Sequence, residues 1–306
     1  ITTSTFSATG NTHTGYVRFT TVNMIASIIT FDTNTHTVAI SSGSYNAYGF
    51  EFSSSVYIKT GTVLTFSNSQ IHATHTTGSV SKKGYAFYWA TSAYVQTASI
   101  VKYLDNDIQG KTVAAPGYAI YQRGKYSGAS YYLFNTWNTV VGDVYFYLTE
   151  YPFPLIVTTV TNPTMDLTIQ GAVDNQIEFT DLSIISLNVN GAQVIGAGEH
   201  LKFNNVAFTG ISYIQNALVQ NSVLEIKDST FASTLRFTAL DIETSTATVT
   251  NNNFLTWEWS SCDIITTSTL TATGNTHTGY VRFTTVNMIA STITFDTNTH
   301  TVAISS

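Results

Sequence analysis

The chain has 306 residues, a formal net charge of −6 and a single cysteine, and 10% of its residues are charged, against about a quarter in ordinary globular proteins. Twelve basic residues against eighteen acidic ones exclude the basic surface that binds nucleic acid or an anionic membrane. The lone Cys262 excludes an internal disulfide framework and a cysteine-based zinc site. We expect it to be a small buried residue, with an interchain crosslink as the alternative.

The first 42 residues of the chain return at its end. Residues 265–306 align with residues 1–42 without a gap and differ at three positions. The three differences are Phe6/Leu270, Ser7/Thr271 and Ile28/Thr292. Such identity indicates tandem repetition. We therefore expect residues 1–264 to form one full module and residues 265–306 to begin the next, continuous with it, as a window onto a longer array.

A short strand-like block recurs along the chain. Its first and third positions are mostly apolar, as strand alternation requires, and its fourth and fifth are mostly polar, as a bend requires. In the first part of the chain these blocks are ITFDTNTH at 29, LTFSNSQI at 64 and VKYLDNDI at 101. The additional residues follow the eighth position of each block, which predicts longer inserted loops on one face.

Beyond Tyr131 the pattern blurs. Pro152 and Pro154 disfavour a central strand, so we expect an irregular layer in this region.

The spacing becomes regular in the last part of the chain. The blocks there are IEFTDLSI at 177, LKFNNVAF at 201, LEIKDSTF at 224, ATVTNNNF at 247, LTATGNTH at 270 and ITFDTNTH at 293. A period of 23 residues with further short strands in each block resembles the coil of the right-handed parallel β-helix, best known from the pectin-lyase-like fold. The scarcity of helix-favouring residues agrees with an all-β chain. We expect an all-β, right-handed parallel β-helix with coils of about 23 residues and longer inserted loops on one face.

Stacked coils place equivalent positions in columns about 4.8 Å apart. The sixth position of the block predicts a ladder of hydrogen-bonded amides, and the eighth predicts a core column of stacked rings. The ladder residues are Asn252, Asn275, Asn298 and, in the first part of the chain, Asn106. The ring column comprises Phe208, Phe231, Phe254, His277 and His300.

Two groups of residues could carry chemistry. His13 and His36, like His277 and His300, are 23 residues apart and could ligate a metal, but their position is filled by phenylalanine in other blocks, so we expect stacked rings.

The second group is Asp105 and Asp107, which could cleave a glycan or bind calcium, although the register places Asp105 in a bend. The motifs of polygalacturonases and pectate lyases are missing, so the resemblance implies the fold and not the activity. We expect no catalytic site, no metal and no cofactor.

The best candidate for an interaction surface is an aromatic-rich region beside the inserted loops. Exposed tyrosine and tryptophan rings favour sugar stacking or protein contacts. The candidate residues are Tyr85, Trp89, Tyr118, Tyr121, Tyr126, Lys82 and Lys83.

These observations predict a structural protein. We expect a tandem-repeat β-solenoid that forms an extracellular or cell-surface rod, fibre or filament with lateral self-association. Its partner would be the chain itself, through head-to-tail modules and lateral contacts. The alternative is a glycan-binding adhesin or tailspike-like β-helix that uses the aromatic surface, and a third reading is a polysaccharide-cleaving enzyme using Asp105 and Asp107. No apolar run reaches the length of a transmembrane helix.

Overall fold

The computed structural model describes residues 1–41, 45–76, 83–112, 117–127, 131–134, 139–147, 155–171 and 176–301. The described residues form β-strands joined by bends and turns, with no helix, which confirms the all-β prediction. They accordingly contain no helix long and apolar enough to cross a membrane. The chain divides into two compact units, Ile1–Phe153 with Thr159–Leu167, and Pro154–Thr158 with Thr168–Ser306.

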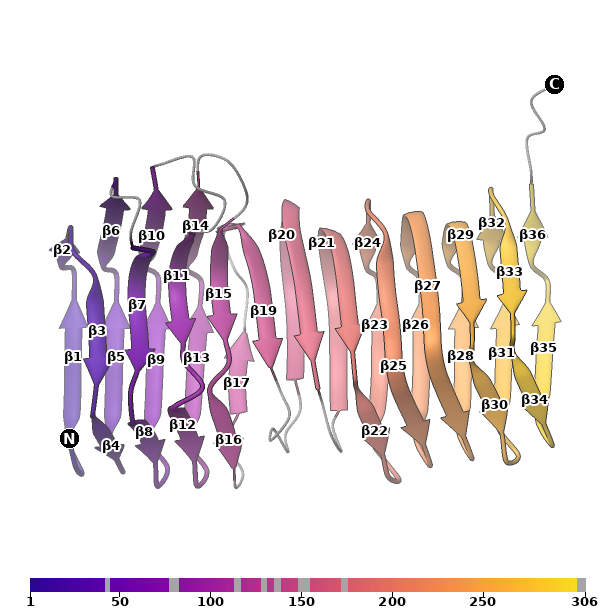
Figure 1. The fold of residues 1–306 in the computed structure, drawn as a ribbon, viewed down its shortest axis with the longest axis horizontal. Helices are drawn as coiled ribbons and strands as arrows, with labels where there is room; N and C mark the ends of the chain where they lie inside the picture. Colours follow the sequence, from indigo (N-terminus) through magenta and orange to yellow (C-terminus); the bar gives the residue numbers. More distant parts are fainter. Residues whose placement is uncertain are drawn as a thin grey trace. The chain divides into compact units, whose positions relative to one another are not determined.

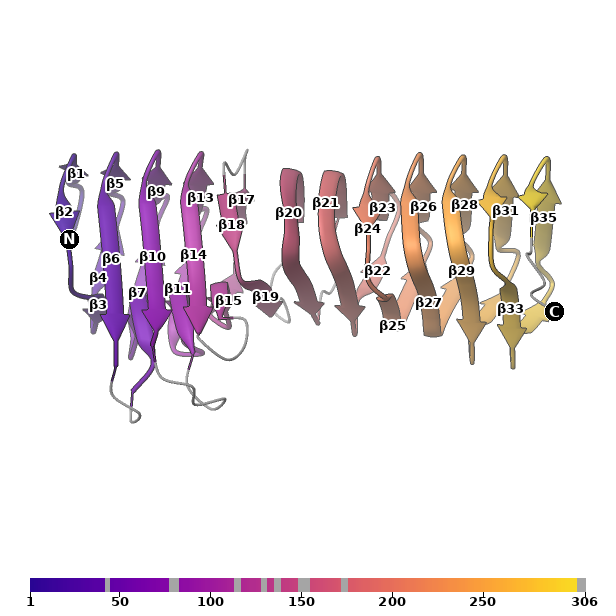
Figure 2. The ribbon, with the colours of Figure 1, turned by 90° about the horizontal axis from the view of Figure 1, so that it is seen from above.

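The first unit consists of parallel strands in three sheets, and consecutive strands of the chain lie in different sheets (Figures 1 and 2). One sheet contains β2 (Thr12–His13), β6 (Thr35–Ile40), β10 (Gln70–His75), β14 (Asp107–Thr112) and β18 (Thr139–Val141). A second contains β4 (Asn23–Ile25), β8 (Val56–Lys59), β12 (Ala93–Gln96) and β16 (Lys125–Ser127). The other strands pair in the largest sheet: β1 (Thr5–Thr9), β3 (Val17–Thr20), β5 (Ile28–Asp32), β7 (Ala47–Ser53), β9 (Val63–Ser67), β11 (Gly84–Trp89), β13 (Ile100–Leu104), β15 (Tyr118–Gln122), β17 (Tyr131–Phe134) and β19 (Asp143–Tyr147).

The strand register of the first unit follows the recurring block. Phe6 pairs with Ile29, Ile29 with Leu64, and Leu64 with Val101. The inserted residues after the eighth position first lengthen β6, β10 and β14, so that the insertions are strand before they become loop. The tips of the insertions and the two prolines of the expected irregular layer lie outside the described residues. Strand β20 (Leu155–Gln170) follows.

The second unit also consists of parallel strands (Figure 1). They are β21 (Gln176–Asn190), β22 (Gln193–Ile195), β23 (His200–Asn204), β24 (Ala207–Phe208), β25 (Ser212–Gln220), β26 (Val223–Lys227), β27 (Thr230–Glu243), β28 (Thr246–Thr250), β29 (Asn253–Ser260), β30 (Asp263–Ile265), β31 (Thr269–Thr273), β32 (Thr276–His277), β33 (Val281–Thr284), β34 (Asn287–Ile289), β35 (Thr292–Asp296) and β36 (Thr299–His300). The first positions of successive blocks pair in the order Ile177, Leu201, Leu224, Ala247, Leu270 and Ile293. Residues 23 apart therefore lie side by side from Leu201 onward. We call one such run of strands a layer.

The fifth position of each block makes the bend. These residues have a left-handed backbone with φ of 50–67°, a conformation that asparagine, aspartate and glycine tolerate best. In the second unit they are Asn205, Asp228, Asn251, Gly274 and Thr297. The preference for these residue types at the bend explains why the pattern is visible in the sequence.

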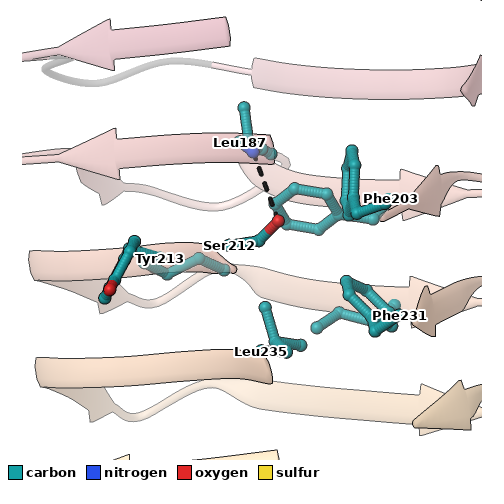
Figure 3. Close-up of a pocket in the computed structure, with 9 residues that line it drawn as sticks. Leu187, Phe203, Ser212, Tyr213, Phe231 and Leu235 are labelled. Carbon is teal, nitrogen blue, oxygen red and sulfur yellow. Dashed lines mark hydrogen bonds between the residues drawn. The ribbon is translucent and has the colours of Figure 1, made fainter. Parts of the chain in front are cut away.

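Apolar side chains fill the space between the sheets of each unit. The largest fully buried side chains include Trp89, Tyr103, Trp257 and Trp259. Figure 3 shows part of the core of the second unit, where the backbone amide of Leu187 donates to Ser212 Oγ at 3.2 Å. The space that these side chains line is too narrow for a water molecule. Parallel strands, regular register and a dry core make both units compatible with a β-helix or solenoid.

Candidate interaction surface

A column of three tyrosines lies on the outer side of β7, β11 and β15, which pair side by side in the first unit (Figure 1). The rings of Tyr48 and Tyr85 stack with their centroids 5.4 Å apart, and the rings of Tyr85 and Tyr118 stack at the same distance. All three side chains are half-buried. The parallel register therefore converts residues that are 33 or more positions apart into one continuous stack.

A second column runs beside the first. Tyr88 stacks on Tyr121 at 5.7 Å, and Tyr121 stacks on Tyr145 of β19 at 4.9 Å. The two columns also touch each other edge to face, with Tyr118 and Tyr121 only 4.8 Å apart. We call the two columns together the tyrosine face, which comprises Tyr48, Tyr85, Tyr88, Tyr118, Tyr121 and Tyr145.

The two columns exist because strand alternation is broken once in β11. Tyr85 and Tyr88 are three residues apart and would point to opposite sides of a regular strand. Between them Ala86 and Phe87 are both fully buried, so the parity of the strand reverses there. The burial pattern of β15 contains the same break.

This break corrects the prediction for Trp89. Strict alternation from Tyr85 would place Trp89 outside, whereas its side chain is fully buried. Its ring stacks on Phe52 at 3.7 Å, and Nε1 donates to the hydroxyl of Tyr103 at 2.9 Å. Trp89 is therefore a core residue and contributes no exposed ring to the surface.

Charged groups border the tyrosine face. Glu51 is the register partner of Tyr88, and the Nε of Arg18 donates to it at 2.6 Å. This contact raises the pKa of Arg18. Lys83 Nζ lies 4.5 Å from the ring centroid of Tyr118, within the range of a cation–π interaction. Among the other candidate residues, the side chain of Tyr126 and the whole of Lys82 lie outside the described part of the structure.

The surface also contains an unusual carboxyl. Asp143 is the register partner of Tyr118, and burial together with the nearby Asp166 raises its pKa to about 6. Burial likewise raises the pKa of Tyr85, so this phenol remains protonated at neutral pH and can donate a hydrogen bond.

The stacking geometry decides what the tyrosine face offers to a partner. Within each column the planes of neighbouring rings lie within about 25° of each other, as at Tyr85 and Tyr118, where the angle is 12°. Each inner ring therefore has its faces covered by its neighbours. Sugar stacking requires an open ring face, whereas this surface presents ring edges and hydroxyl groups. It is better suited to contacts with another protein surface.

The predicted ladder residues of the second unit lie in one hydrogen-bonded column. Asn252 Nδ2 donates to Asn275 Oδ1 at 3.0 Å, and Asn275 Nδ2 donates to Asn298 Oδ1 at 3.0 Å. Asn106 lies in an equivalent column of the first unit, where its Oδ1 accepts from the backbone amide of Ser69 at 3.0 Å. Serine can thus take the place of asparagine in this column.

The predicted ring column is continuous in the second unit. Its centroid distances are 5.4 Å from Phe208 to Phe231, 5.0 Å to Phe254, 5.2 Å to His277 and 5.8 Å to His300. Burial, followed by the proximity of His300, lowers the pKa of His277, as expected for an uncharged ring in a core stack.

The two acidic residues weighed as catalytic groups are not paired with each other. Asp107 contacts His72 Nε2 at 2.9 Å and accepts from Gln109 Nε2 at 2.9 Å, while Asp105 occupies a left-handed bend with φ of 54°. Within the described ranges, no cluster of three or more His, Cys, Asp or Glu side chains could hold a metal ion.

No protein-family model, curated protein or solved structure matches the chain. The functional argument therefore depends on the surface itself.

Sequence reasoning missed Tyr48 and Tyr145, which complete the two columns, and the ion pair between Arg18 and Glu51. The signal for the columns was present. Each strand carries a Tyr, two apolar or small residues and a second outward residue, as in YGFE, YAFY and YAIY. This pattern becomes meaningful only when the break in alternation is known.

Proposed function

We propose that the chain is part of an extracellular or cell-surface structural protein in which tandem modules form a rod, fibre or filament. The observation that carries the proposal is the repeated segment, whose two copies form the same strands with the same pairing. Thr5 lies opposite Ile28 in the first copy, and Thr269 lies opposite Thr292 in the second. A rod gains length from such duplication, and every surface recurs along it at a fixed interval.

The fold that supports this function best is a right-handed parallel β-helix with coils of 23 residues in the second unit and longer coils in the first. Pairing between residues 23 apart supports the coil length. The right hand follows from the strong preference of parallel crossover connections for that hand. One module of residues 1–264 would then be followed by another that starts at residue 265.

The tyrosine face is the surface that we assign to lateral association between rods. Its inner ring faces are covered, its hydroxyls are directed outward, and Lys83 and Glu51 at its border supply opposite charges. Tyrosine is enriched where two proteins meet because one side chain provides both apolar area and a hydrogen bond. The low total charge of the chain limits electrostatic repulsion between parallel rods.

Electron microscopy and sedimentation of the full chain at rising concentration test this proposal. We expect fibres or bundles, with diffraction at about 4.8 Å along the axis. Replacing Tyr88 and Tyr121 by serine should disperse bundles into single particles without unfolding them. The matched control replaces Tyr57 and Tyr94, a pair stacked at 5.1 Å on β8 and β12, by serine.

Compact monomers at every concentration would contradict the structural role. Equal loss of bundling in both double variants would contradict the assignment to the tyrosine face. Binding to a glycan panel that disappears in the Tyr88/Tyr121 variant alone would instead favour the adhesin alternative.

A further inference from the structure

The two copies of the repeated segment expose opposite faces. In the first copy Phe19 and Phe31 are partly buried, whereas their counterparts Phe283 and Phe295 are 42% and 48% exposed in the second. The exposed residues of the second copy line an open apolar depression of about 540 Å³. Since the residues are identical, the difference lies in what is stacked on them.

In the first copy the cover is the layer of residues 47–69. Phe52 stacks on Phe19 at 4.9 Å, and Phe66 stacks on Phe31 at 5.2 Å. Ile58 is the register partner of Met24, and Leu64 that of Ile29. Polar groups match as well, because Ser67 Oγ donates to Asp32 Oδ1 at 2.7 Å. The cover is therefore complementary in both shape and hydrogen bonding.

In the second copy the stacked layer lies on the other side and consists of residues 246–265. Leu270 pairs with Ala247, and the rings of Trp259 and Phe283 stack at 6.1 Å. The corresponding side of the first copy is exposed, with Phe6 at 46%. Each copy thus shows one of the two interfaces that this segment can make.

An ion-pair column identifies the order of the layers. In the first copy Arg18 donates to Glu51 of the following layer at 2.6 Å. In the second copy Glu258 of the preceding layer accepts from the hydroxyl of Tyr280 at 2.7 Å and lies 3.6 Å from Arg282. Arg236 also donates to Glu258 at 2.6 Å. Because the positions of Arg18 and Arg282 are equivalent, combining the two interfaces produces alternating charges along one column.

We propose that the exposed face of residues 281–296 is a docking surface for the segment 47–69 of a further copy of the module. This inference rests on the tandem arrangement proposed above and names the segment that covers the open end. Counterparts of Phe52, Ile58, Leu64 and Phe66 fill the apolar depression, and a counterpart of Glu51 pairs with Arg282.

Charge argues against the simplest other occupant, the N-terminal end of a second chain. That end presents β3, and β3 would bring Arg18 beside Arg282 in the same column, with like charges adjacent. The segment 47–53 brings Glu51 to that position. The docking partner is therefore the layer that follows the repeated segment, and not the repeated segment itself.

The test compares the 306-residue chain with the same chain extended in frame by a second copy of residues 43–306. Hydrogen exchange is measured at dilutions where both are monomeric, so the result does not depend on fibre formation. We expect the amides of residues 281–296 to gain protection by on the order of tenfold or more in the extended chain, to the level of residues 17–32. A matched extension carries Phe52→Asp in its added copy alone and should lose this gain.

Unchanged exchange at residues 281–296 in the extended chain overturns the proposal, as does an extended chain whose junction fails to fold. Equal protection by the Phe52→Asp extension also overturns it, because the apolar contact would then be irrelevant. Protection at the junction without bundling would support the docking surface and contradict only lateral association.

Discussion

The two copies of the repeated segment form a natural experiment on burial. Met24 is fully buried in the first copy, and its counterpart Met288 is 58% exposed in the second. On the opposite side the relation is reversed, since Leu270 is fully buried and Phe6 is 46% exposed. The same sequence therefore contributes core on either side. In stacked parallel layers the neighbours decide which of the two faces is buried.

The largest expected effect comes from placing a charge in this position of each copy. Met24→Asp buries an unpaired carboxylate and should lower the free energy of unfolding by about 4 kcal/mol or more. Met288→Asp, the same substitution on the open face, should change it by less than about 0.5 kcal/mol. Urea unfolding followed by circular dichroism measures both. Equal effects would mean that the two copies are covered alike in solution.

The reverse comparison concerns the opposite face. Leu270→Ala leaves a cavity beneath Ala247 and should cost about 3 kcal/mol, within the usual range for a buried leucine. Phe6→Ala removes a half-exposed ring that contacts only the edge of the stack through Phe31, and should cost less than about 1 kcal/mol. The same unfolding curves provide the measurement. A larger cost at Phe6 than at Leu270 would contradict the burial pattern.

Much of this arrangement could be predicted from the sequence because the bend and the ladder impose specific residue types. The block starts at Leu201, Leu224 and Ala247 are register partners, as their spacing indicates. The tyrosine face could not be predicted in full, since the break at Ala86 and Phe87 reverses strand parity without any proline or glycine to mark it. Exposure at the repeated segment was equally out of reach, because identical letters have different neighbours.

The next effect depends on pH. His36 is buried against His13 and the carbonyl of Gly49, and burial lowers its pKa from 6.5 to about 4. The folded state then binds fewer protons than the unfolded state between these values. Stability from this residue is complete above pH 6.5 and is lost as the pH falls toward 4, by about 2 kcal/mol at pH 4.5.

Melting temperatures between pH 7.5 and 4.5 test this dependence. His36→Phe should flatten the profile while preserving the fold, because phenylalanine occupies the same column position at Phe231 and Phe254. His300, at the exposed end of the equivalent stack, provides the control, and His300→Phe should leave the slope of the wild-type profile unchanged. A profile of unaltered slope in His36→Phe would show that another group controls the acid response.

The smallest expected effect separates the two copies through the asparagine ladder. Asn275 is fully buried, and its Nδ2 donates to the carbonyl of Val249 at 2.8 Å while its Oδ1 accepts from the amide of Asn252 at 2.9 Å. Asn275→Ala leaves these buried groups unpaired and should cost about 1 to 2 kcal/mol. Asn11, its exposed counterpart, bonds only toward the following layer through Asn34, so Asn11→Ala should cost less than about 0.5 kcal/mol.

A serine variant shows which bond matters. At Ser229 the same ladder position is occupied by a hydroxyl that accepts from the amide of Val206 at 3.2 Å. Asn275→Ser should therefore keep the acceptor for Asn252 and recover part of the loss, whereas Asn275→Ala should not. If both substitutions cost the same, the bond from Nδ2 to Val249 carries the stabilisation, and the ladder owes its strength to the donor that reaches back to the preceding layer.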